Sequence, residues 1–185
     1  MASGYLITGP PGVGKTTVLL KVIQVVEAEG FRVGGMICRE VRVGRSRVGF
    51  KVEDLTTGRQ GWLAHRDFKT SVRVGRYGVN LRDLESVGVE ALKRALKDPG
   101  VHLIALDEIG PMELKSRLFR DTVLEVVRGP KPLVAIVHYR ARDALIDHVK
   151  SLRTLKVVRV SIMNRDRLPV EIAGELVKLL KGGGR

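Results

Sequence analysis

Cysteine, aromatic residues and long apolar runs are all scarce in this sequence. The single cysteine, Cys38, cannot form a disulfide within the chain, and we expect a buried thiol in a reducing compartment. Aromatic residues make up 4% of the chain, which leaves little surface for stacking on nucleic-acid bases. No apolar run approaches the roughly 18 to 20 residues that cross a bilayer, and no basic, cleavable leader precedes the first apolar segment. We therefore expect a cytoplasmic protein with no membrane partner.

Acidic residues are outnumbered by basic ones. Lys and Arg number 33 against 20 Asp and Glu, a formal net charge of +13. Such an excess attracts polyanions, so a nucleic-acid partner is an open alternative. The basic residues are nevertheless spread along the chain, with one local concentration at Arg39, Arg42, Arg45 and Arg47. The composition permits nucleic-acid binding without requiring it, and many arginines with few Asn and Gln also suit a thermostable protein.

The length bounds the domain organisation. A chain of 185 residues, 44% of them hydrophobic, can bury one sizeable core. We expect a single domain over residues 1–181, acting as a monomer. The closing GGGR, residues 182–185, is expected to be a disordered tail.

Strand and helix patterns alternate over most of the chain. Strands are expected at 4–8, 101–107, 132–138 and 155–161. Helices are expected at 15–30, 83–97, 113–128, 141–151 and 169–181. Continuous apolar strands that alternate with helices predict an α/β fold with a mainly parallel central sheet covered on both faces. Extended segments at 33–41, 48–55, 58–65 and 71–80 predict a β-hairpin insertion over about 33–80.

A phosphate-binding loop follows the first strand. The segment ITGPPGVGKTT, residues 7–17, contains the pattern G-x-x-x-x-G-K-[ST] between a strand and a helix. Glycines let several backbone N–H groups point at one phosphate, Lys15 reaches the outer phosphates, and the Thr16 hydroxyl can bind Mg²⁺. The candidate nucleotide-binding residues of this loop are Gly9, Pro10, Pro11, Gly12, Val13, Gly14, Lys15, Thr16 and Thr17.

Two adjacent acids follow a second apolar strand. In HLIALDEIGPMEL, residues 102–114, Asp107 ends the strand and Glu108 comes next. The carboxyl ends of parallel strands lie at one edge of the sheet, where ligands bind. We expect Asp107 to hold Mg²⁺, directly or through water, and Glu108 to activate a water for attack on the γ-phosphate. Lys15 and Glu108 are therefore the candidate catalytic residues.

Other polar residues are weaker candidates. Asn164 follows the last strand, and we hypothesise loose contact with the base or ribose, against the alternative of a simple helix-entry turn. His138 ends a strand on the ligand side, where it can sense the γ-phosphate or serve only as a hydrogen-bonded strand end. Trp62 is most simply a packing residue.

An arginine usually stabilises the charge on a phosphoryl group during its transfer. The sequence alone does not distinguish among the candidates Arg42, Arg45, Arg47, Arg76, Arg140 and Arg165.

At these motifs the chain resembles a known family. The shared segments are 7–17, EVRVGRSRVGFKVEDLTTG at 40–58, VGRYGVNL at 74–81, DEIGPMEL at 107–114 and NRDRLP at 164–169. They run over nearly the whole length. The family is that of the thermophilic nucleoside-triphosphatases, whose vertebrate relative is called cancer-related nucleoside-triphosphatase.

The resemblance implies a fold, an activity and site residues. It implies a small three-layer P-loop domain of RecA-like type, with a catalytic glutamate beside the metal-binding aspartate. It implies slow hydrolysis of nucleoside triphosphates with little base preference, phosphate binding by Gly9 to Thr17, a magnesium ligand at Asp107 and water activation by Glu108. Pro111 departs from the lysine that many members have after DEIG.

Three functions remain open at this point. The first is a nucleoside-triphosphatase that acts on ATP, GTP, CTP and UTP with Mg²⁺ as cofactor and water as acceptor. The second is a nucleotide kinase that phosphorylates nucleoside monophosphates, with the arginine-bearing middle of the chain as acceptor site or lid. The third is a triphosphatase that nucleic acid stimulates.

Overall fold

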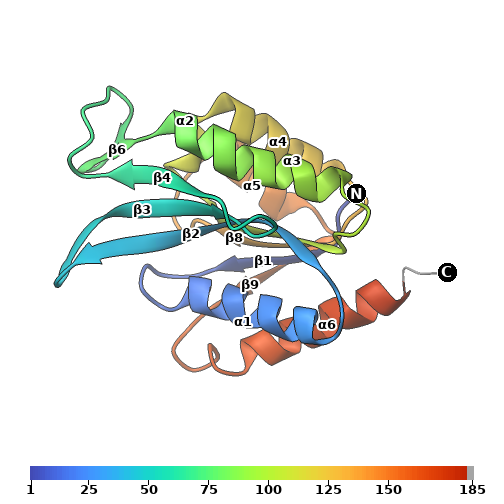
Figure 1. The fold of residues 1–185 in the computed structure, drawn as a ribbon. Coiled ribbons are helices and arrows are strands. Elements are labelled where there is room, and N and C mark those ends of the chain that lie inside the picture. Colours follow the sequence, from blue (N-terminus) through green and yellow to red (C-terminus); the bar gives the residue numbers. More distant parts are fainter. Residues whose placement is uncertain (183–185) are drawn as a thin grey trace.

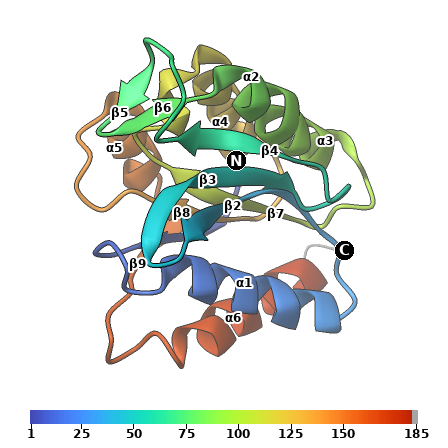
Figure 2. The same ribbon diagram turned by 60° about the vertical axis from the view of Figure 1, so that its left-hand side comes forward.

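The computed structural model describes residues 1–182, and over these residues nine strands form one continuous sheet. The strand order is β5-β6-β4-β3-β2-β7-β8-β1-β9. Helices cover both faces of this sheet, as Figures 1 and 2 show. The predicted three-layer α/β architecture is therefore confirmed. Of the predicted tail, residue 182 is the last residue of helix α6, and residues 183–185 lie outside the described part of the chain.

The half of the sheet that contains both nucleotide motifs is parallel. Its strands, in spatial order, are β2 (Val33–Val43), β7 (Leu103–Ile109), β8 (Leu133–Val137), β1 (Gly4–Thr8) and β9 (Leu155–Arg159). Strands β1 and β8 are buried at every position, which explains their continuous apolar sequence. Strand β8 separates β1 from β7. The phosphate loop and the acidic pair therefore stand at one edge of the sheet, with one strand between them.

The predicted hairpin insertion extends the sheet beyond β2. Its strands are β3 (Ser46–Asp54), β4 (Gln60–His65), β5 (Arg73–Val74) and β6 (Tyr77–Val79), which pair antiparallel. The β2–β3 hairpin projects beyond the parallel strands, toward the left in Figure 1. Its turn contains Gly44, whose positive φ of 58° suits a tight connection. The hairpin therefore overhangs the edge of the sheet at which the phosphate loop lies.

Two layers of helices enclose the sheet. One face carries α1 (Lys15–Ala28) and α6 (Leu168–Gly182). The other face carries α2 (Leu81–Asp83), α3 (Glu90–Lys97), α4 (Arg117–Arg128) and α5 (Ala144–Ser151). Helix α1 starts directly from the phosphate loop and packs against α6. The loop is thus held between a buried strand and a helix that is itself covered.

Two of the predicted helices are broken. The segment expected as one helix over 83–97 begins at Leu81 and contains a π-helical turn over Leu84–Val89 before α3. The segment expected as one helix over 113–128 is a 3₁₀ turn followed by α4. The break falls at Ser116, whose Oγ accepts a hydrogen bond from the Phe119 amide at 3.0 Å. Because this serine caps a new helix, the chain turns sharply just after the acidic motif.

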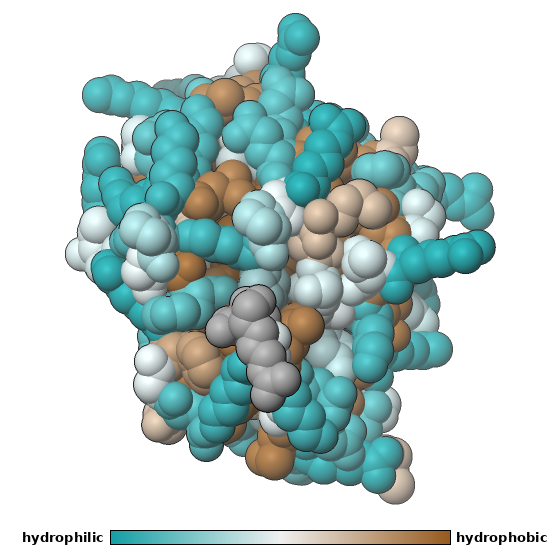
Figure 3. Space-filling view, turned by 90° about the vertical axis from the view of Figure 1, so that its right-hand side faces the viewer, coloured by the Kyte–Doolittle hydropathy of each residue, from teal (hydrophilic) through white to brown (hydrophobic). Residues whose placement is uncertain are grey.

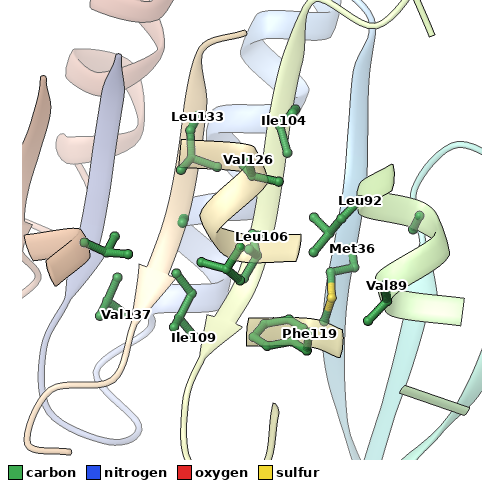
Figure 4. Close-up of a cluster of buried hydrophobic side chains, with 14 of the residues drawn as sticks. Met36, Val89, Leu92, Ile104, Leu106, Ile109, Phe119, Val126, Leu133 and Val137 are labelled. Carbon is green, nitrogen blue, oxygen red and sulfur yellow. The ribbon is translucent and has the colours of Figure 1, made fainter. Parts of the chain in front are cut away.

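The core lies on both sides of the sheet. Figure 4 shows part of the larger cluster, in which side chains from β2, β7, α3 and α4 meet between the sheet and its helices. Met36, Leu106 and Phe119 in this cluster are fully buried. The second cluster joins α1 and α6 to the opposite face. These clusters fix the strand ends from which the site is built.

The outer surface facing away from the hairpin is mainly polar. Figure 3 shows that face, on which hydrophilic side chains predominate and apolar ones form small separate groups. Within residues 1–182, none of the helices combines the length and apolar character needed to cross a membrane.

Candidate active site

The phosphate loop has the backbone conformation that its glycines predict. Gly9 leaves β1 with φ of 151°, and a Cβ there would lie 2.8 Å from the carbonyl oxygen of Val160. Gly14 caps the start of α1 in the left-handed conformation, with φ of 105°. A side chain at either position would clash or strain the backbone. The loop can therefore present its N–H groups, and the N-terminus of α1, to an anion.

Lys15 and Thr16 are the two polar side chains that begin α1. The Lys15 ammonium donates to the carbonyl oxygens of Gly9 and Pro10, at 3.0 and 3.1 Å. The Thr16 hydroxyl donates to Asp107 Oδ2 at 2.9 Å. The hydrogen bond from Thr16 joins two motifs that are 91 residues apart in the sequence. The two residues expected to share a metal ion are therefore in direct contact.

Asp107 and Glu108 lie at an irregularity in strand β7. The pairing of β7 with β8 shifts between Leu106 and Ile109, so the two acids lie where the regular ladder is interrupted. Strand β7 itself continues to Ile109, two residues beyond its predicted end. Asp107 is only 3% exposed, whereas Glu108 is partly exposed. The shift allows both side chains to line the same cavity as the phosphate loop.

The acidic pair is electrostatically unusual. Burial raises the pKa of Asp107 to about 7, against the hydrogen bond from Thr16 that lowers it. Burial also raises the pKa of Glu108, while His138 and Lys15 lower it. Ionising a buried carboxyl group costs free energy, and a nearby cation lowers that cost by stabilising the carboxylate. The chemistry of the donors therefore fits a hard divalent ion held by Asp107 and Thr16.

The protein supplies only part of a metal coordination shell. Across the part of the chain that is described, no group of three or more His, Cys, Asp or Glu side chains could hold a metal ion by itself. Mg²⁺ in phosphate sites usually takes one or two protein oxygens and completes its shell with phosphates and water. Asp107 and Thr16 match that pattern.

His138 stands at the end of β8, between the two motifs. Its Nδ1 accepts hydrogen bonds from the amides of Arg140 and Ala141, at 3.3 and 2.9 Å. A neutral ring with Nδ1 as acceptor carries its proton on Nε2. His138 also lines the cavity beside Glu108. It can therefore donate one hydrogen bond at the position expected for the γ-phosphate.

The cavity around these residues has a volume of about 740 Å³. Of the predicted loop residues, Gly9, Pro11, Gly12, Gly14, Lys15, Thr16 and Thr17 line it. Sequence reasoning missed a second group of lining residues, namely Cys38, Phe50, Leu63, Val74, Met112 and Glu113. Met112 and Glu113 lie in the DEIGPMEL segment just after the acidic pair, whereas the others come from separate strands that only the folded sheet brings together. Cys38, expected to be buried, is partly exposed to this cavity.

Of the six candidate arginines, Arg47 alone lines the cavity. Arg47 lines the cavity, where it pairs with Glu40 at 2.6 Å. Arg165 approaches the other side of the loop, with Cδ 3.9 Å from where a Cβ on Gly14 would stand. The candidates that do not line the cavity are Arg42, Arg45, Arg76, Arg140 and Arg165. Arg47 is therefore the candidate best placed to approach a phosphoryl group.

Asn164 and Trp62 make contacts within their own surroundings. Asn164 Oδ1 accepts from the Ser161 amide at 2.8 Å, and its Nδ2 donates to the Arg159 carbonyl at 3.0 Å. The amide thus holds the β9–α6 loop, which agrees with a helix-entry turn. Trp62 packs edge-on against His65. A contact between Asn164 and the base stays a prediction.

Glu113 is an almost fully buried acid close to Asp107 and Glu108. Burial raises its pKa from 4.5 to about 8, and the charge of Glu108 adds to that effect. Between these two values the folded protein binds one more proton than the unfolded chain. Folding stability should therefore fall as the pH rises through this range, by up to about 1.4 kcal/mol per pH unit from this group.

The variant Glu113→Gln isolates this contribution. Because an amide does not titrate, we expect its melting temperature to fall less between pH 5 and pH 9 than that of the unsubstituted protein. Thermal unfolding followed by circular dichroism at both pH values measures the difference. Glu90→Gln, at an exposed position on α3, is the matched control. An equal loss in the Glu113 variant and the parent would contradict a buried, protonated Glu113.

The fold and the site together define a class. In the parallel sheet, one strand lies between the strand before the glycine-rich loop and the strand with the Asp-Glu pair. Thr16 and Asp107 are in contact across that strand. This is the arrangement of P-loop nucleoside-triphosphatase folds. A family model described as NTPase matches residues 4–173. The chain belongs to this NTPase family, which confirms the resemblance drawn from the sequence.

Curated relatives and solved structures agree with that assignment. A nucleoside-triphosphatase THEP1 from Thermofilum pendens is 42% identical over 180 residues, 97% of this chain and 98% of the relative. The THEP1 protein of Methanocaldococcus jannaschii is 44% identical over 95% of this chain and 98% of its own. The crystal structure of THEP1 from Aquifex aeolicus matches with a TM-score of 0.83 at 33% identity, over 94% of this chain and 98% of that one.

A human protein shares the fold. The solution structure of a human cancer-related nucleoside triphosphatase matches with a TM-score of 0.81 at 32% identity. The match covers 96% of this chain and 98% of the human one. The chain is therefore similar to these proteins over nearly its full length.

Proposed function

We propose that this protein hydrolyses nucleoside triphosphates to nucleoside diphosphates and inorganic phosphate. The observation that carries the proposal is the hydrogen bond between Thr16 and Asp107, which joins the phosphate loop to the acidic motif beside Glu108. The names of the relatives, nucleoside-triphosphatases of similar length, support the same activity. Membership of the NTPase family supports it independently of the site geometry.

Each group at the site has a separate role in the reaction. The loop N–H groups and the Lys15 ammonium bind the β- and γ-phosphates and offset their charge. Asp107 and Thr16 would hold Mg²⁺, which would offset the negative charge of the phosphate oxygens. Glu108 accepts a proton from the attacking water and orients that water in line with the bond to be broken. His138 donates a hydrogen bond to the γ-phosphate through Nε2.

We further propose that the base is read loosely. The Asn164 amide is engaged within the β9–α6 loop, so it has little capacity left to distinguish one base from another. ATP, GTP, CTP and UTP should therefore all be substrates. Release of inorganic phosphate from each of the four, measured with Mg²⁺ and compared at equal concentration, tests the proposal. No release from any of them would reject it.

The proposed role of the metal ion predicts that phosphate release depends on Mg²⁺. Chelation with EDTA should abolish phosphate release, and added Mg²⁺ should restore it. In Asp107→Asn we expect the Mg²⁺ concentration for half-maximal activity to rise about 10- to 100-fold, a usual cost of losing a carboxylate that orients a metal or its water. Asp121→Asn, at an exposed position on α4, is the control. An unchanged Mg²⁺ dependence in Asp107→Asn would remove Asp107 from the metal site.

A further inference from the structure

The cavity is larger than hydrolysis requires. Its volume of about 740 Å³ falls within the range of small-molecule sites, roughly 300 to 1,000 Å³. An attacking water occupies only about 30 Å³ of liquid volume. The triphosphate takes the part of the cavity beside the phosphate loop, and the nucleoside is expected beside the β9–α6 loop near Asn164, whose residues do not line the cavity. The remaining space therefore calls for a different occupant.

The surplus space lies toward the antiparallel extension. Phe50 on β3, Leu63 on β4 and Val74 on β5 line the cavity. In the sheet, β3 is four strand positions from β1 and two from β7. At about 4.8 Å per strand, that places Phe50 about 19 Å from the strand that carries the phosphate loop. From β7, which carries Glu108, the same spacing gives only about 10 Å, so a ring packed against Phe50 can place a hydroxyl on a short arm beside the γ-phosphate.

The walls of this region are mostly apolar or neutral. Phe50, Val74 and Met112 offer ring, aliphatic and thioether surfaces, and Leu63 lies behind them at 1% exposure. Glu113, whose pKa is about 8 because of burial, is neutral at pH 7 and lies 3.9 Å from the Cys38 sulfur. Apolar walls with a few neutral polar groups favour a neutral ligand with a flat or bulky apolar body.

The charges at the rim argue against a phosphorylated ligand. Two arginines line this side of the cavity, and both are already paired: Arg39 with Glu53 at 2.7 Å and Arg47 with Glu40 at 2.6 Å. The third cation of the lining, Lys15, belongs to the phosphate loop. Both arginines already contact a carboxylate, although Glu40 is shared between Arg47 and Arg42, so a monophosphate would have to compete with Glu53 or Glu40 for them. These carboxylate partners disfavour a nucleoside monophosphate as the acceptor.

We propose that this region binds an organic alcohol with a flat apolar ring, and that its hydroxyl replaces water as the acceptor of the γ-phosphoryl group. We call the region the distal cavity; it comprises Cys38, Phe50, Leu63, Val74, Met112 and Glu113. The proposal rests on the proposed function, because it uses the same phosphate loop and the same Glu108. It gives the protein a phosphotransferase activity in addition to hydrolysis.

The transfer step balances without a further reactant. The alcohol oxygen forms a bond to the γ-phosphorus, and the bond from that phosphorus to the β,γ-bridging oxygen breaks. The hydroxyl proton passes to Glu108, and the electron pair of the broken bond stays on the nucleoside diphosphate. The products are a phosphate monoester, the nucleoside diphosphate and one proton. Because alcohols and water are similarly weak acids, the base that serves one serves the other.

The first experiment compares acceptors. The full chain is incubated with Mg-ATP labelled in the γ-phosphate, alone or with benzyl alcohol, adenosine or glycerol. We expect labelled phosphate monoester from the two ring-bearing alcohols. Benzyl alcohol should give about tenfold more ester than glycerol at equal concentration, because only its ring buries apolar area. The reaction without an alcohol measures hydrolysis itself, so failure of the proposed function shows separately as no phosphate release.

A paired substitution locates the acceptor. Val74→Trp puts a large ring into the distal cavity and should lower ester formation about tenfold or more, since added bulk opposes a bound ring. Val43→Trp, at a 67% exposed site near the hairpin tip, is the matched control. Thermal unfolding of both variants verifies that they fold.

The outcomes separate clearly. Ester formation that Val74→Trp reduces and Val43→Trp does not would support the proposal. Label found only in inorganic phosphate with every alcohol would overturn it while leaving hydrolysis in place. Equal ester from benzyl alcohol and glycerol, or equal loss in the two tryptophan variants, would also overturn it, since the apolar cavity would then have no part in choosing the acceptor.

Discussion

Glu108→Gln is expected to bind nucleoside triphosphate and to turn it over about 10² to 10⁴ times more slowly than the unsubstituted protein, the usual effect of removing a general base. The glutamine keeps the size of the side chain but cannot accept the proton of the attacking water. Glu108 lines the cavity together with the phosphate loop, so its carboxylate is placed to reach that water. Single-turnover phosphate release and binding of a fluorescent ATP analogue measure the two effects separately.

The control for this variant distinguishes charge at the site from charge in general. Glu125→Gln removes one negative charge from an exposed position on α4 and should leave turnover unchanged. Near-normal hydrolysis by Glu108→Gln would remove Glu108 from the role of base. A loss of nucleotide binding equal to the loss of turnover would instead mean that Glu108 acts on the metal or the phosphates, not on the water.

The local motifs predicted the half of the site that lies between β1 and β7. The loop pattern before Lys15 and the acids after an apolar strand each depend on a few neighbouring residues, and the parallel sheet brings their strand ends together by a general rule. The Thr16–Asp107 contact follows from that rule. The sequence therefore predicted the loop and the acidic pair as parts of one site, and the structure brings them together.

The other half of the site could not be found in this way. Phe50, Leu63 and Val74 lie on the antiparallel strands β3, β4 and β5, and only the folded sheet brings these three strands around one cavity. Apolar residues on a strand have the same pattern whether they face a packed core or a cavity. The helix break at Ser116 was missed for a related reason, since a serine inside a helical pattern acts as a cap only when its surroundings favour the turn.

The choice among the arginines needed three-dimensional contacts as well. Arg42, Arg45 and Arg47 all lie within one hairpin, and in sequence they are equivalent. Only Arg47 among them lines the cavity, even though Arg42 is its cross-strand partner on the same face of the hairpin. Glu40 and the ring of Phe50 hold the Arg47 guanidinium in place. Which of these arginines lines the cavity therefore depends on contacts in the folded hairpin and not on composition.

Lys15→Ala is expected to lower turnover by about two to three orders of magnitude and to weaken nucleotide binding, since one preorganised donor to a developing negative charge is worth about that much. In the structure, the Lys15 ammonium donates to the Gly9 and Pro10 carbonyls. These neutral acceptors keep Lys15 over the loop without cancelling its charge. A triphosphate offers anionic oxygens instead, which bind an ammonium more strongly than carbonyls do.

The contribution of Lys15 is therefore electrostatic and local, and a matched lysine should not share it. Lys21 lies further along the same helix and is exposed, so Lys21→Ala should leave binding and turnover unchanged. Isothermal titration with a slowly hydrolysed ATP analogue and Mg²⁺ gives the affinity, and phosphate release gives the rate. If Lys15→Ala kept full affinity and rate, the positive charge at the loop would come from another group, and Arg165 beside Gly14 would be the first to substitute.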